Sequence, residues 1–309
     1  MRAGDILKAI VGIVAVLGAV IVGLLYFPVP KPHVELGAEQ VCQIAGFPIT
    51  NTLIASWITI VVLLAIFILG TRRMKMMPTG LQNVVEWIYE SLYNFAEEAA
   101  GKENTPKFFP LFATIFLYVI GAAFISLIPG FDTIGDGARE HFTGAFAGSY
   151  TGWVVHEPLL RKASSDINFP LALALIAFAS WTYWAIRMIG VRKYSRQFIK
   201  LENLGEGFKL MSRGDFKSAP MAFFMGGVDI FVGFLEFLSR CIQIVSLTFR
   251  LFGNMLAGAI LLLIILYLIP WIGGVPFYGL EALFGFVQAL IFAGLTLVFS
   301  VIATTAEHE

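Results

Sequence analysis

The chain has 309 residues, of which 58% are hydrophobic and only 14% are charged. Soluble domains carry about 25% charged residues, so this composition indicates an integral membrane protein whose partners are lipid and other membrane subunits. The 21 basic and 21 acidic residues cancel, which gives no support to a nucleic-acid partner, and Cys42 and Cys241 are too few for a disulfide framework or a thiolate metal site.

Four apolar segments precede the last third of the chain, each close to the roughly 20 residues that a membrane helix needs. They cover residues 10–27, 53–69, 108–128 and 169–186, and two more follow. The first could be a signal peptide because Arg2 and Lys8 precede it, but the stretch LLYFPVPKP offers no small-x-small cleavage site. We therefore expect a retained anchor and an all-α membrane protein with about six membrane helices.

Lysine and arginine collect in two loops, and cytoplasmic loops hold the excess of these residues. The second and fourth segments are followed by Arg72, Arg73 and Lys75, and by Arg187, Arg192, Lys193, Arg196, Lys200, Lys209, Arg213 and Lys217. Residues 28–50 contain only one lysine or arginine, Lys31. This asymmetry predicts that both termini face the cytoplasm. Trp181, Tyr183 and Trp184, near the basic end of the fourth segment, have the position of interfacial anchors.

Residues 81–100 alternate apolar and polar side chains with the period of a helix. One face holds Leu81, Val84, Val85, Ile88, Leu92, Phe95 and Ala99, and the other holds Glu86, Glu90, Asn94, Glu97 and Glu98. The pattern predicts an amphipathic helix at the cytoplasmic surface, which lies on the membrane or packs on a partner subunit. The acidic face favours the partner, because anionic lipid would repel it.

Residues 131–165 are rich in glycine and carry His141 and His156. They predict a long outer loop. Loops of this length are usually functional or disordered, and the sequence does not decide between the two.

Arg250 lies in the apolar stretch SLTFRLFGNMLAGAILLLIILYL and is the only charged residue between Arg240 and Glu281. An arginine at mid-bilayer costs about 2.5–3.5 kcal/mol on insertion scales, so such residues line a pathway or pair with an opposite charge. Glu236 stands four residues before Arg240, and these two can neutralise each other. We therefore expect Arg250 to be functional and its partner to lie outside its own helix.

Two lines of polar positions follow the last two apolar segments at helical spacing. The first line contains Glu236, Ser239, Gln243, Ser246, Arg250 and Asn254, and the second contains Glu281, Gly285, Gln288, Phe292, Thr296 and Ser300. Serine, threonine and glutamine commonly hydrogen-bond across helix interfaces, which is the simpler explanation for Ser246 or Thr296 alone. That explanation does not cover Arg250.

A guanidinium cannot hand on a proton, but it can act as a fixed positive charge. Such a charge favours the ionised form of a carboxylate brought beside it and repels cations. With Arg250 as the divide, the predicted topology separates an inner group, Glu236 and Ser239, from an outer group, Asn254, Glu281 and Gln288.

These residues resemble the subunit a family of the F-type ATP synthase. SLTFRLFGNMLAG is similar to the signature around that family's essential arginine, VQALIFAGLTLVFSVIATTAEH to its C-terminal helix, and SSDIN to the polar motif before its fourth helix. The likeness spans about residues 50–309. It implies two long, tilted helices against a ring of c subunits, each with one membrane carboxylate, which Arg250 would meet.

The resemblance also implies roles for other residues. It places Asn254 and Gln288 in an outer half-channel, Asp166 and Asn168 at its mouth, and Glu236 and Ser239 in an inner half-channel. Two positions depart from the family: Ala259 stands where many relatives carry a carboxylate, and Glu281 stands where the final helix often has histidine. We therefore expect Glu281 to supply the titratable group of the outer path.

The predicted function is that of a non-catalytic, proton-translocating stator subunit in the bacterial plasma membrane, with no cofactor and with ATP chemistry on other subunits. Its predicted partners are the c-subunit ring, the b subunits of the peripheral stalk and other membrane subunits of the synthase. Residues 1–50 are predicted as an N-terminal membrane anchor and outer loop, and residues 51–309 as the subunit a-like membrane domain.

The alternative is an independent secondary transporter or channel. A voltage sensor repeats its arginines at every third residue, whereas Arg250 stands alone. A secondary transporter is built from two related halves, and the sequence shows no internal repeat. The sequence also has no phosphate-binding loop, no metal-binding histidine cluster and no Ser-His-Asp arrangement, which argues against a self-contained enzyme or a metal site. It does not distinguish H⁺ from Na⁺ as the coupling ion.

Overall fold

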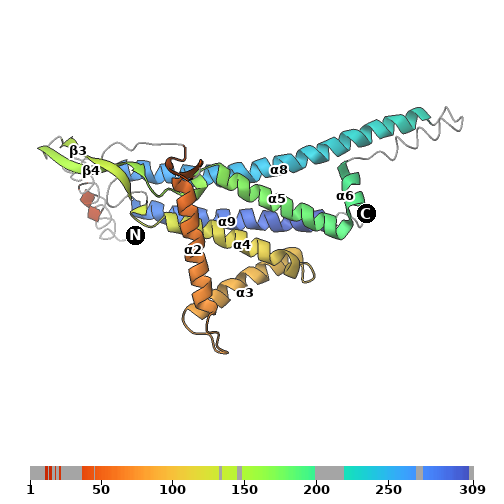
Figure 1. The fold of residues 1–309 in the computed structure, drawn as a ribbon, viewed down its shortest axis with the longest axis horizontal. Coiled ribbons are helices and arrows are strands. Elements are labelled where there is room, and N and C mark those ends of the chain that lie inside the picture. The colour runs from red at the N-terminus through yellow and green to blue at the C-terminus, as the bar shows by residue number, and fades with distance from the viewer. Residues whose placement is uncertain are drawn as a thin grey trace. The chain divides into compact units, whose positions relative to one another are not determined.

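The computed structural model describes residues 11, 12, 14, 15, 18 and 21 and the ranges 37–44, 46–131, 134–144, 148–198, 219–268 and 274–305. Figure 1 shows the elements along the chain. They are β1 (Gln40–Ile44), β2 (Phe47–Thr50), α2 (Asn51–Thr71), α3 (Leu81–Ala100), α4 (Thr105–Ser126), β3 (Gly135–Gly144), β4 (Gly148–Pro158), the short 3-10 helix η2 (Ala163–Ser165), α5 (Asn168–Ile189), α6 (Val191–Phe198), α8 (Ala219–Leu268) and α9 (Gly274–Thr305).

Among the described residues, five helices are long and apolar enough to cross a membrane: α2, α4, α5, α8 and α9. They coincide with the predicted segments from residue 53 onward, so the all-α membrane class is confirmed. Most of the predicted first span, 10–27, lies outside the described residues. Helix α8 has 50 residues. At 1.5 Å per residue it is about 75 Å long, so in a hydrocarbon layer of about 30 Å it must tilt or project.

Local residues set the ends of α2 and α5. The side-chain oxygen of Thr50 caps α2 by accepting a hydrogen bond from the Leu53 N–H at 3.3 Å. Helix α5 ends at Gly190, whose φ of 91° is a conformation that glycine adopts readily. The Gly190 N–H still donates to the Ile186 carbonyl at 2.9 Å, which satisfies one of the carbonyls at the end of α5.

The predicted amphipathic helix is confirmed as α3, with the predicted bounds. Its buried apolar side chains are Val85, Leu92, Ala96 and Ala100. Tyr93 packs edge-on against Phe109 of α4 with ring centroids 5.1 Å apart, whereas Trp87 is 67% exposed. The apolar surface of α3 is therefore only partly covered by the chain itself, and lipid or a partner subunit remains to cover the rest.

The chain divides into two compact units, and α3, α4, α8 and α9 contribute residues to both. Unit 1 comprises Met1–Gln82, Phe116–Asp166 and Leu251–Leu290. Unit 2 comprises Asn83–Ile115, Ile167–Arg250 and Ile291–Glu309.

Small residues allow the helices of unit 1 to approach one another closely. A Cβ at Gly121 of α4 would lie 3.1 Å from a methyl carbon of Leu63 in α2. A Cβ at Gly285 of α9 would lie 2.8 Å from the Ala123 Cβ in α4. Packing of this kind is typical of membrane helix interfaces, where lipid offers no hydrophobic driving force between helices.

Trp181 is fully buried in unit 2. Its ring meets Phe178 and Phe299 edge-on, with centroids 5.6 Å and 5.2 Å apart. The interpretation of Trp181 as an interfacial anchor is therefore wrong, because its position along the sequence did not reveal which face of α5 it occupies. Tyr183, by contrast, is 54% exposed and lies under the Arg187 guanidinium, so its anchoring role stays a prediction.

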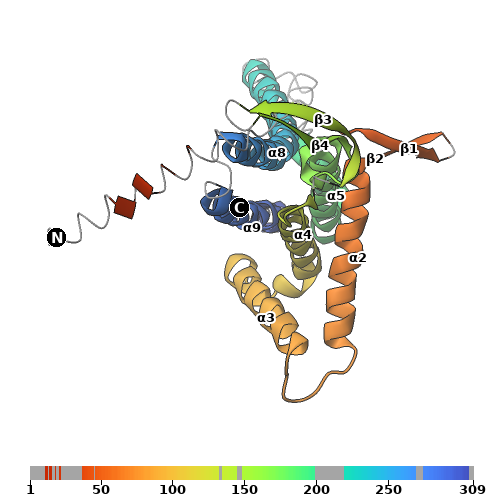
Figure 2. The same cartoon turned by 90° about the vertical axis from the view of Figure 1, so that its left-hand side faces the viewer.

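The stretch predicted as a long outer loop contains a β-hairpin. Strand β3 pairs antiparallel with β4, from Gly135 opposite Pro158 to Gly144 opposite Gly148 (Figure 2). The register shifts between Asp136 and Gly137. A shorter hairpin joins β1 and β2. The membrane helices are thus accompanied by two small sheets that the sequence analysis did not predict.

Asn51 connects the start of α2 to Glu39, which directly precedes β1, and to Pro158 at the end of β4. Its side chain is fully buried, and its Nδ2 donates to the Pro158 carbonyl at 3.1 Å. Its Oδ1 accepts from the Glu39 N–H at 3.3 Å, and its own N–H donates to the Glu39 carbonyl at 3.1 Å. Every one of these bonds satisfies a backbone group that would otherwise lose its partner on burial.

Candidate functional site

The predicted site residues fall into both units. Unit 1 contains Asp166, Asn254, Glu281 and Gln288, and unit 2 contains Asn168, Glu236, Ser239 and Arg250. Unit 1 therefore holds the predicted outer residues except Asn168, and unit 2 holds the predicted inner residues.

The polar line of α9 is buried along its whole length. Glu281 is 4% exposed, and Gln288, Thr296 and Ser300 are each 1% exposed. The Thr296 hydroxyl donates to the Phe292 carbonyl at 2.9 Å, and the Ser300 hydroxyl donates to the Thr296 carbonyl at 2.8 Å. These two hydroxyls are satisfied within their own helix, which supports a structural role for them. Glu281 and Gln288 instead find partners on other segments.

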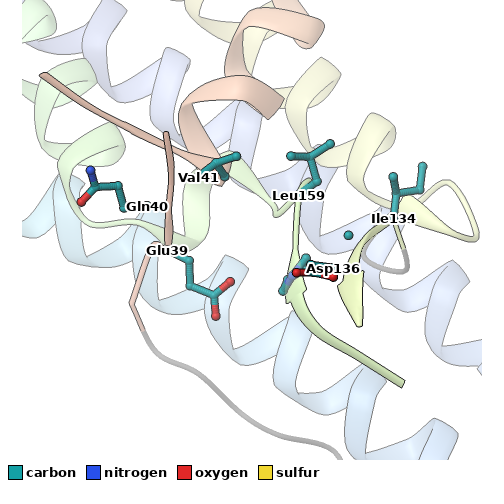
Figure 3. A pocket seen from close by; sticks show the side chains of 8 residues that line it. Glu39, Gln40, Val41, Ile134, Asp136 and Leu159 are labelled. Atoms are coloured by element: carbon teal, nitrogen blue, oxygen red, sulfur yellow. The ribbon is translucent and has the colours of Figure 1, made fainter. Parts of the chain in front are cut away.

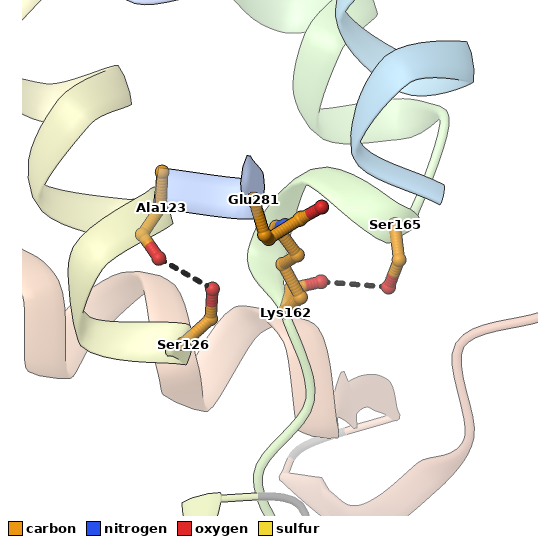
Figure 4. Close-up of polar contacts among 5 residues, drawn as sticks. All are labelled: Ala123, Ser126, Lys162, Ser165 and Glu281. Carbon is orange, nitrogen blue, oxygen red and sulfur yellow. Dashed lines mark hydrogen bonds and ion pairs between the residues drawn. The ribbon is translucent and has the colours of Figure 1, made fainter. Parts of the chain in front are cut away.

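Glu281 forms a buried ion pair with Lys162, which directly precedes η2. Lys162 Nζ donates to Glu281 Oε1, and the two side chains are 7% and 4% exposed (Figure 4). The Ser165 hydroxyl donates to the Lys162 carbonyl at 2.7 Å and so holds the backbone of this segment. The two charges compensate each other where both side chains are almost fully buried, a situation in which loss of one partner is strongly destabilising.

The Glu281 carboxylate lies in space that glycine leaves free at position 258 of α8. A Cβ at Gly258 would overlap Glu281 Oε2. The carboxylate therefore starts on α9 but reaches the surface of α8 at Gly258. A side chain at 258 and the present position of the Glu281 carboxylate exclude each other.

Asn254 and Gln288 form a second polar contact between α8 and α9 within unit 1. Asn254 Nδ2 donates to Gln288 Oε1 at 2.8 Å. Asn254 is exposed, whereas Gln288 is buried, and Gln288 Nε2 has no hydrogen-bond partner among the described residues. Buried polar groups are rarely left without a partner, so this amide nitrogen marks a place for water or another acceptor.

Asp166 and Asn168 lie next to each other in sequence but in different surroundings. Asp166 is half-buried, and its Oδ2 accepts a hydrogen bond from the Thr52 hydroxyl at 3.3 Å. Asn168 is exposed at the first residue of α5. The SSDIN motif thus gives unit 1 a carboxylate held by α2 and gives the start of α5 an exposed amide.

Arg250 is half-buried in unit 2. Its Nη2 donates to the Ser246 hydroxyl of the preceding turn at 3.5 Å, a long hydrogen bond. Within the described parts of the chain, no carboxylate lies within ion-pair distance of its guanidinium. One side of α8 near it is apolar and exposed, with Phe249 at 57% and Ile242 at 57%, whereas Leu247 and Leu251 are buried. The arginine is therefore carried by a helix whose surface the chain itself leaves largely uncovered.

Glu236 and Arg240 form the ion pair that their spacing predicts. Arg240 Nη2 and Glu236 Oε1 are 3.1 Å apart, and the side chains are 9% and 42% exposed. Ser239 is exposed on the same helix. The pairing shows that Glu236 is neutralised by Arg240 in this state and is not a partner of Arg250.

A cavity of about 520 Å³ lies elsewhere in unit 1 and shares no residue with the candidate site. Its lining is formed by Glu39, Gln40, Val41, Ile134, Gly135, Asp136, Pro158 and Leu159 (Figure 3). Among the described residues, no group of three or more histidine, cysteine and carboxylate side chains is placed to hold a metal ion.

Sequence reasoning missed Lys162. Its signal is faint, since it stands beside Arg161, which is also basic, and four residues before Asp166. Arg161 donates to the Gly37 carbonyl at 2.6 Å in an exposed bond, whereas Lys162 turns inward. Only the packing of the segment separates the two neighbours.

Long apolar helices mark a polytopic membrane protein, and buried charges and amides within them commonly line ion or proton pathways. Residues 53–300 match the protein family described as "ATP synthase A chain". The chain belongs to this family, whose members are subunits of the membrane sector of ATP synthase and work together with its other subunits.

Individual relatives agree with the family match. The chain is 30% identical over 264 residues to ATP synthase subunit a of Gloeobacter violaceus, an alignment that covers 85% of this chain and 87% of the relative. It is 32% identical over 247 residues to ATP synthase subunit a of Helicobacter pylori strain Shi470, covering 78% and 84%. It is 29% identical over 240 residues to the subunit a of Aliarcobacter butzleri, covering 78% and 82%.

Proposed function

We propose that the chain is the proton-translocating stator subunit of an F-type ATP synthase and is not itself an enzyme. In this function Arg250 separates two offset aqueous half-channels and draws the proton from a carboxylate on each passing c subunit. Proton flow is thereby converted into rotation of the c ring. The b subunits of the peripheral stalk hold the chain in place against this rotation.

The observation that carries the proposal is the state of Arg250. It is half-buried in an apolar helix and lacks a carboxylate partner within the described residues. A permanent charge in such surroundings calls for an opposite charge or a pathway. The exposed apolar surface around it gives a second chain room to bring that charge, and a carboxylate on a rotor does so repeatedly.

The two polar groups supply the half-channels. In the outer path, the amides of Asn254 and Gln288 line the route, Glu281 takes up and releases the proton, and Asp166 and Asn168 lie at the mouth. Gln288 Nε2, which has no hydrogen-bond partner among the described residues, supports the outer path, since water in that path would supply an acceptor. In the inner path, Glu236 and Ser239 lead from Arg250 toward the cytoplasm.

We further propose that the chain resides in the bacterial plasma membrane with both termini in the cytoplasm. Residues 1–50 act as an N-terminal anchor and outer loop, and residues 51–309 as the subunit a-like domain. The family match that begins at residue 53 supports this boundary.

The decisive experiment replaces Arg250 in the assembled synthase. Arg250→Ala should insert and assemble normally but abolish coupled ATP synthesis in membrane vesicles. Arg250→Lys should also fail substantially, because a compact ammonium is not equivalent to a planar guanidinium. The matched control is Arg187→Ala, which should retain synthesis. It removes an exposed guanidinium that lies over the Tyr183 and Trp184 rings and donates to the Tyr183 hydroxyl at 3.0 Å.

Near-normal coupled synthesis by Arg250→Ala would reject the proposal. A second measurement addresses an independent transporter or channel. The purified chain reconstituted alone should not conduct protons, because half of the stator–rotor interface is absent, and rapid conduction by the isolated chain would support the alternative.

A further inference from the structure

We propose that Lys162 is a positioning residue of the outer path: it holds the Glu281 carboxylate in the space beside Gly258 and balances its charge between the arrival of one proton and the next. The inference rests on the proposed function, since it assigns a task within the outer path. It adds a residue that neither the arginine signature nor the C-terminal helix contains.

Burial is the first argument. Both side chains are more than nine-tenths buried, at 7% and 4% exposed. Either charge alone would be strongly unfavourable in such a place, and a carboxylate without a partner takes up a proton to become neutral. The ammonium of Lys162 therefore stabilises the deprotonated Glu281 carboxylate. A proton carrier must return to this deprotonated state in every cycle.

Geometry is the second argument. The ion pair reaches Glu281 Oε1, while Oε2 faces the backbone of α8 at Gly258. Lys162 is itself held by its own segment, whose carbonyl accepts from Ser165 (Figure 4). The lysine thus fixes one carboxylate oxygen and leaves the other directed at α8, the helix that carries Asn254 and, one turn earlier in sequence, Arg250.

The other charged groups of the surrounding elements do not replace Lys162. In unit 1, the described part of α8 from Leu251 to Leu268 contains no charged residue, and α9 contains only Glu281. Helix α2 contains no ionisable side chain. In α4, the Tyr118 hydroxyl forms a hydrogen bond with the Ser56 hydroxyl at 2.6 Å. On the segment from 159 to 166, Arg161 bonds to Gly37 and Asp166 to Thr52.

The proton balance is simple. A proton arriving from the outer side binds the Glu281 carboxylate, and the neutral acid remains beside a positive ammonium. The ammonium repels the added positive charge, so the proton leaves toward the deeper part of the path and the original ion pair returns. Lys162 keeps its own protons throughout and acts only through Glu281.

The test uses the intact synthase in proteoliposomes with the catalytic sector outside, so that the lumen supplies the outer path. ATP synthesis driven by a fixed potassium diffusion potential is measured against the pH of the lumen. Lys162→Met should lower the maximal rate severalfold and raise the pH of half-maximal rate, because the carboxylate loses the neighbouring positive charge. Lys162→Arg keeps the charge and should restore the wild-type profile.

A matched control is Lys102→Met, which removes a lysine from an ion pair with Glu97 whose side chains are 90% and 31% exposed. It should leave the profile unchanged. An unchanged pH of half-maximal rate in Lys162→Met, or a failure of Lys162→Arg to restore it, would overturn the inference.

A double variant keeps the test decisive if Lys162→Met fails to assemble. Lys162→Met/Glu281→Gln should show the same pH profile as Glu281→Gln alone, because the lysine acts only through the carboxylate. A further shift in the double variant would show an independent role and overturn the inference. Arg250→Ala tests the proposed function separately, since its loss of synthesis does not depend on either residue of the ion pair.

Discussion

Asn254 of α8 donates a hydrogen bond to the side-chain oxygen of Gln288 of α9 across 2.8 Å. The nitrogen of the same Gln288 amide, Nε2, has no hydrogen-bond partner among the described residues. The pair combines an exposed amide with a buried one. It therefore joins a surface that water or a partner chain can reach to the interior of unit 1. This is the arrangement that a short polar path between two helices requires.

The first prediction concerns this path. Gln288→Leu has nearly the same volume but removes both the acceptor for Asn254 and the unpaired donor, so proton flux through the assembled membrane sector should fall severalfold while assembly persists. Thr296→Val is the control on the same buried line, because the Thr296 hydroxyl is already satisfied by the Phe292 carbonyl. Equal flux in the two variants would show that Gln288 serves packing alone.

The second prediction concerns the space beside Gly258. In Gly258→Ala the new methyl group would overlap the Glu281 carboxylate, so either α8 and α9 move apart or the ion pair with Lys162 breaks. Overpacking of this kind costs about 1–3 kcal/mol, and the thermal stability of the purified complex and its proton flux should both fall. Gly279→Ala adds a methyl group with no atom within 4 Å and should be tolerated. Wild-type stability and flux for Gly258→Ala would contradict the described position of Glu281.

The third prediction tests the two half-channels. Single cysteines at positions 254 and 288 should react with a charged, impermeant thiol reagent from the outer side, and cysteines at 239 and 236 from the cytoplasmic side. Sealed vesicles of opposite orientation should reverse the order of labelling. Cys42, which is exposed, and Cys241 are first replaced by serine to remove the background. Labelling of all four positions from either side would indicate a continuous pore, and labelling of none would indicate a dry interface.

The fourth prediction concerns stability in unit 2. Trp181→Ala should destabilise the complex by about 3–5 kcal/mol, since it removes a fully buried ring between Phe178 and Phe299. Trp181→Phe should cost much less, because the indole N–H has no partner in the described part of the chain and its loss breaks no hydrogen bond. Leu175→Ala, at a position 48% exposed on the same helix, is the control. Thermal inactivation of the detergent-solubilised complex measures all three.

Sequence patterns predicted the elements whose signals are local. Helix α3 has the predicted bounds because its polar and apolar faces repeat within one segment, and α2 is apolar throughout. The hairpin of β3 and β4 escaped prediction because it depends on pairing between strands, and its glycine-rich sequence lacks the strict alternation of a half-buried strand.

The candidate site divides in the same way. Helical spacing placed Glu281 and Gln288 on one face of a helix, and both are buried there. Lys162 could not be found by spacing, because it lies 119 residues before Glu281 and belongs to no helix. Arg161 and Lys162 are both basic, so residue type does not reveal which side chain points outward and which is buried. The turn of the chain into η2 decides this.

The bonds of Asn51 bear on how the protein is made. The side chain of this residue meets Pro158, 107 positions later, and its neighbour Thr52 meets Asp166, 114 positions later. During synthesis α2 therefore leaves the ribosome long before the groups that complete its first turn exist. Docking of α2 through these bonds therefore follows the synthesis of the segment up to Asp166. Until that segment has been made, the Asn51 side chain lacks the Pro158 carbonyl that it binds in the folded chain.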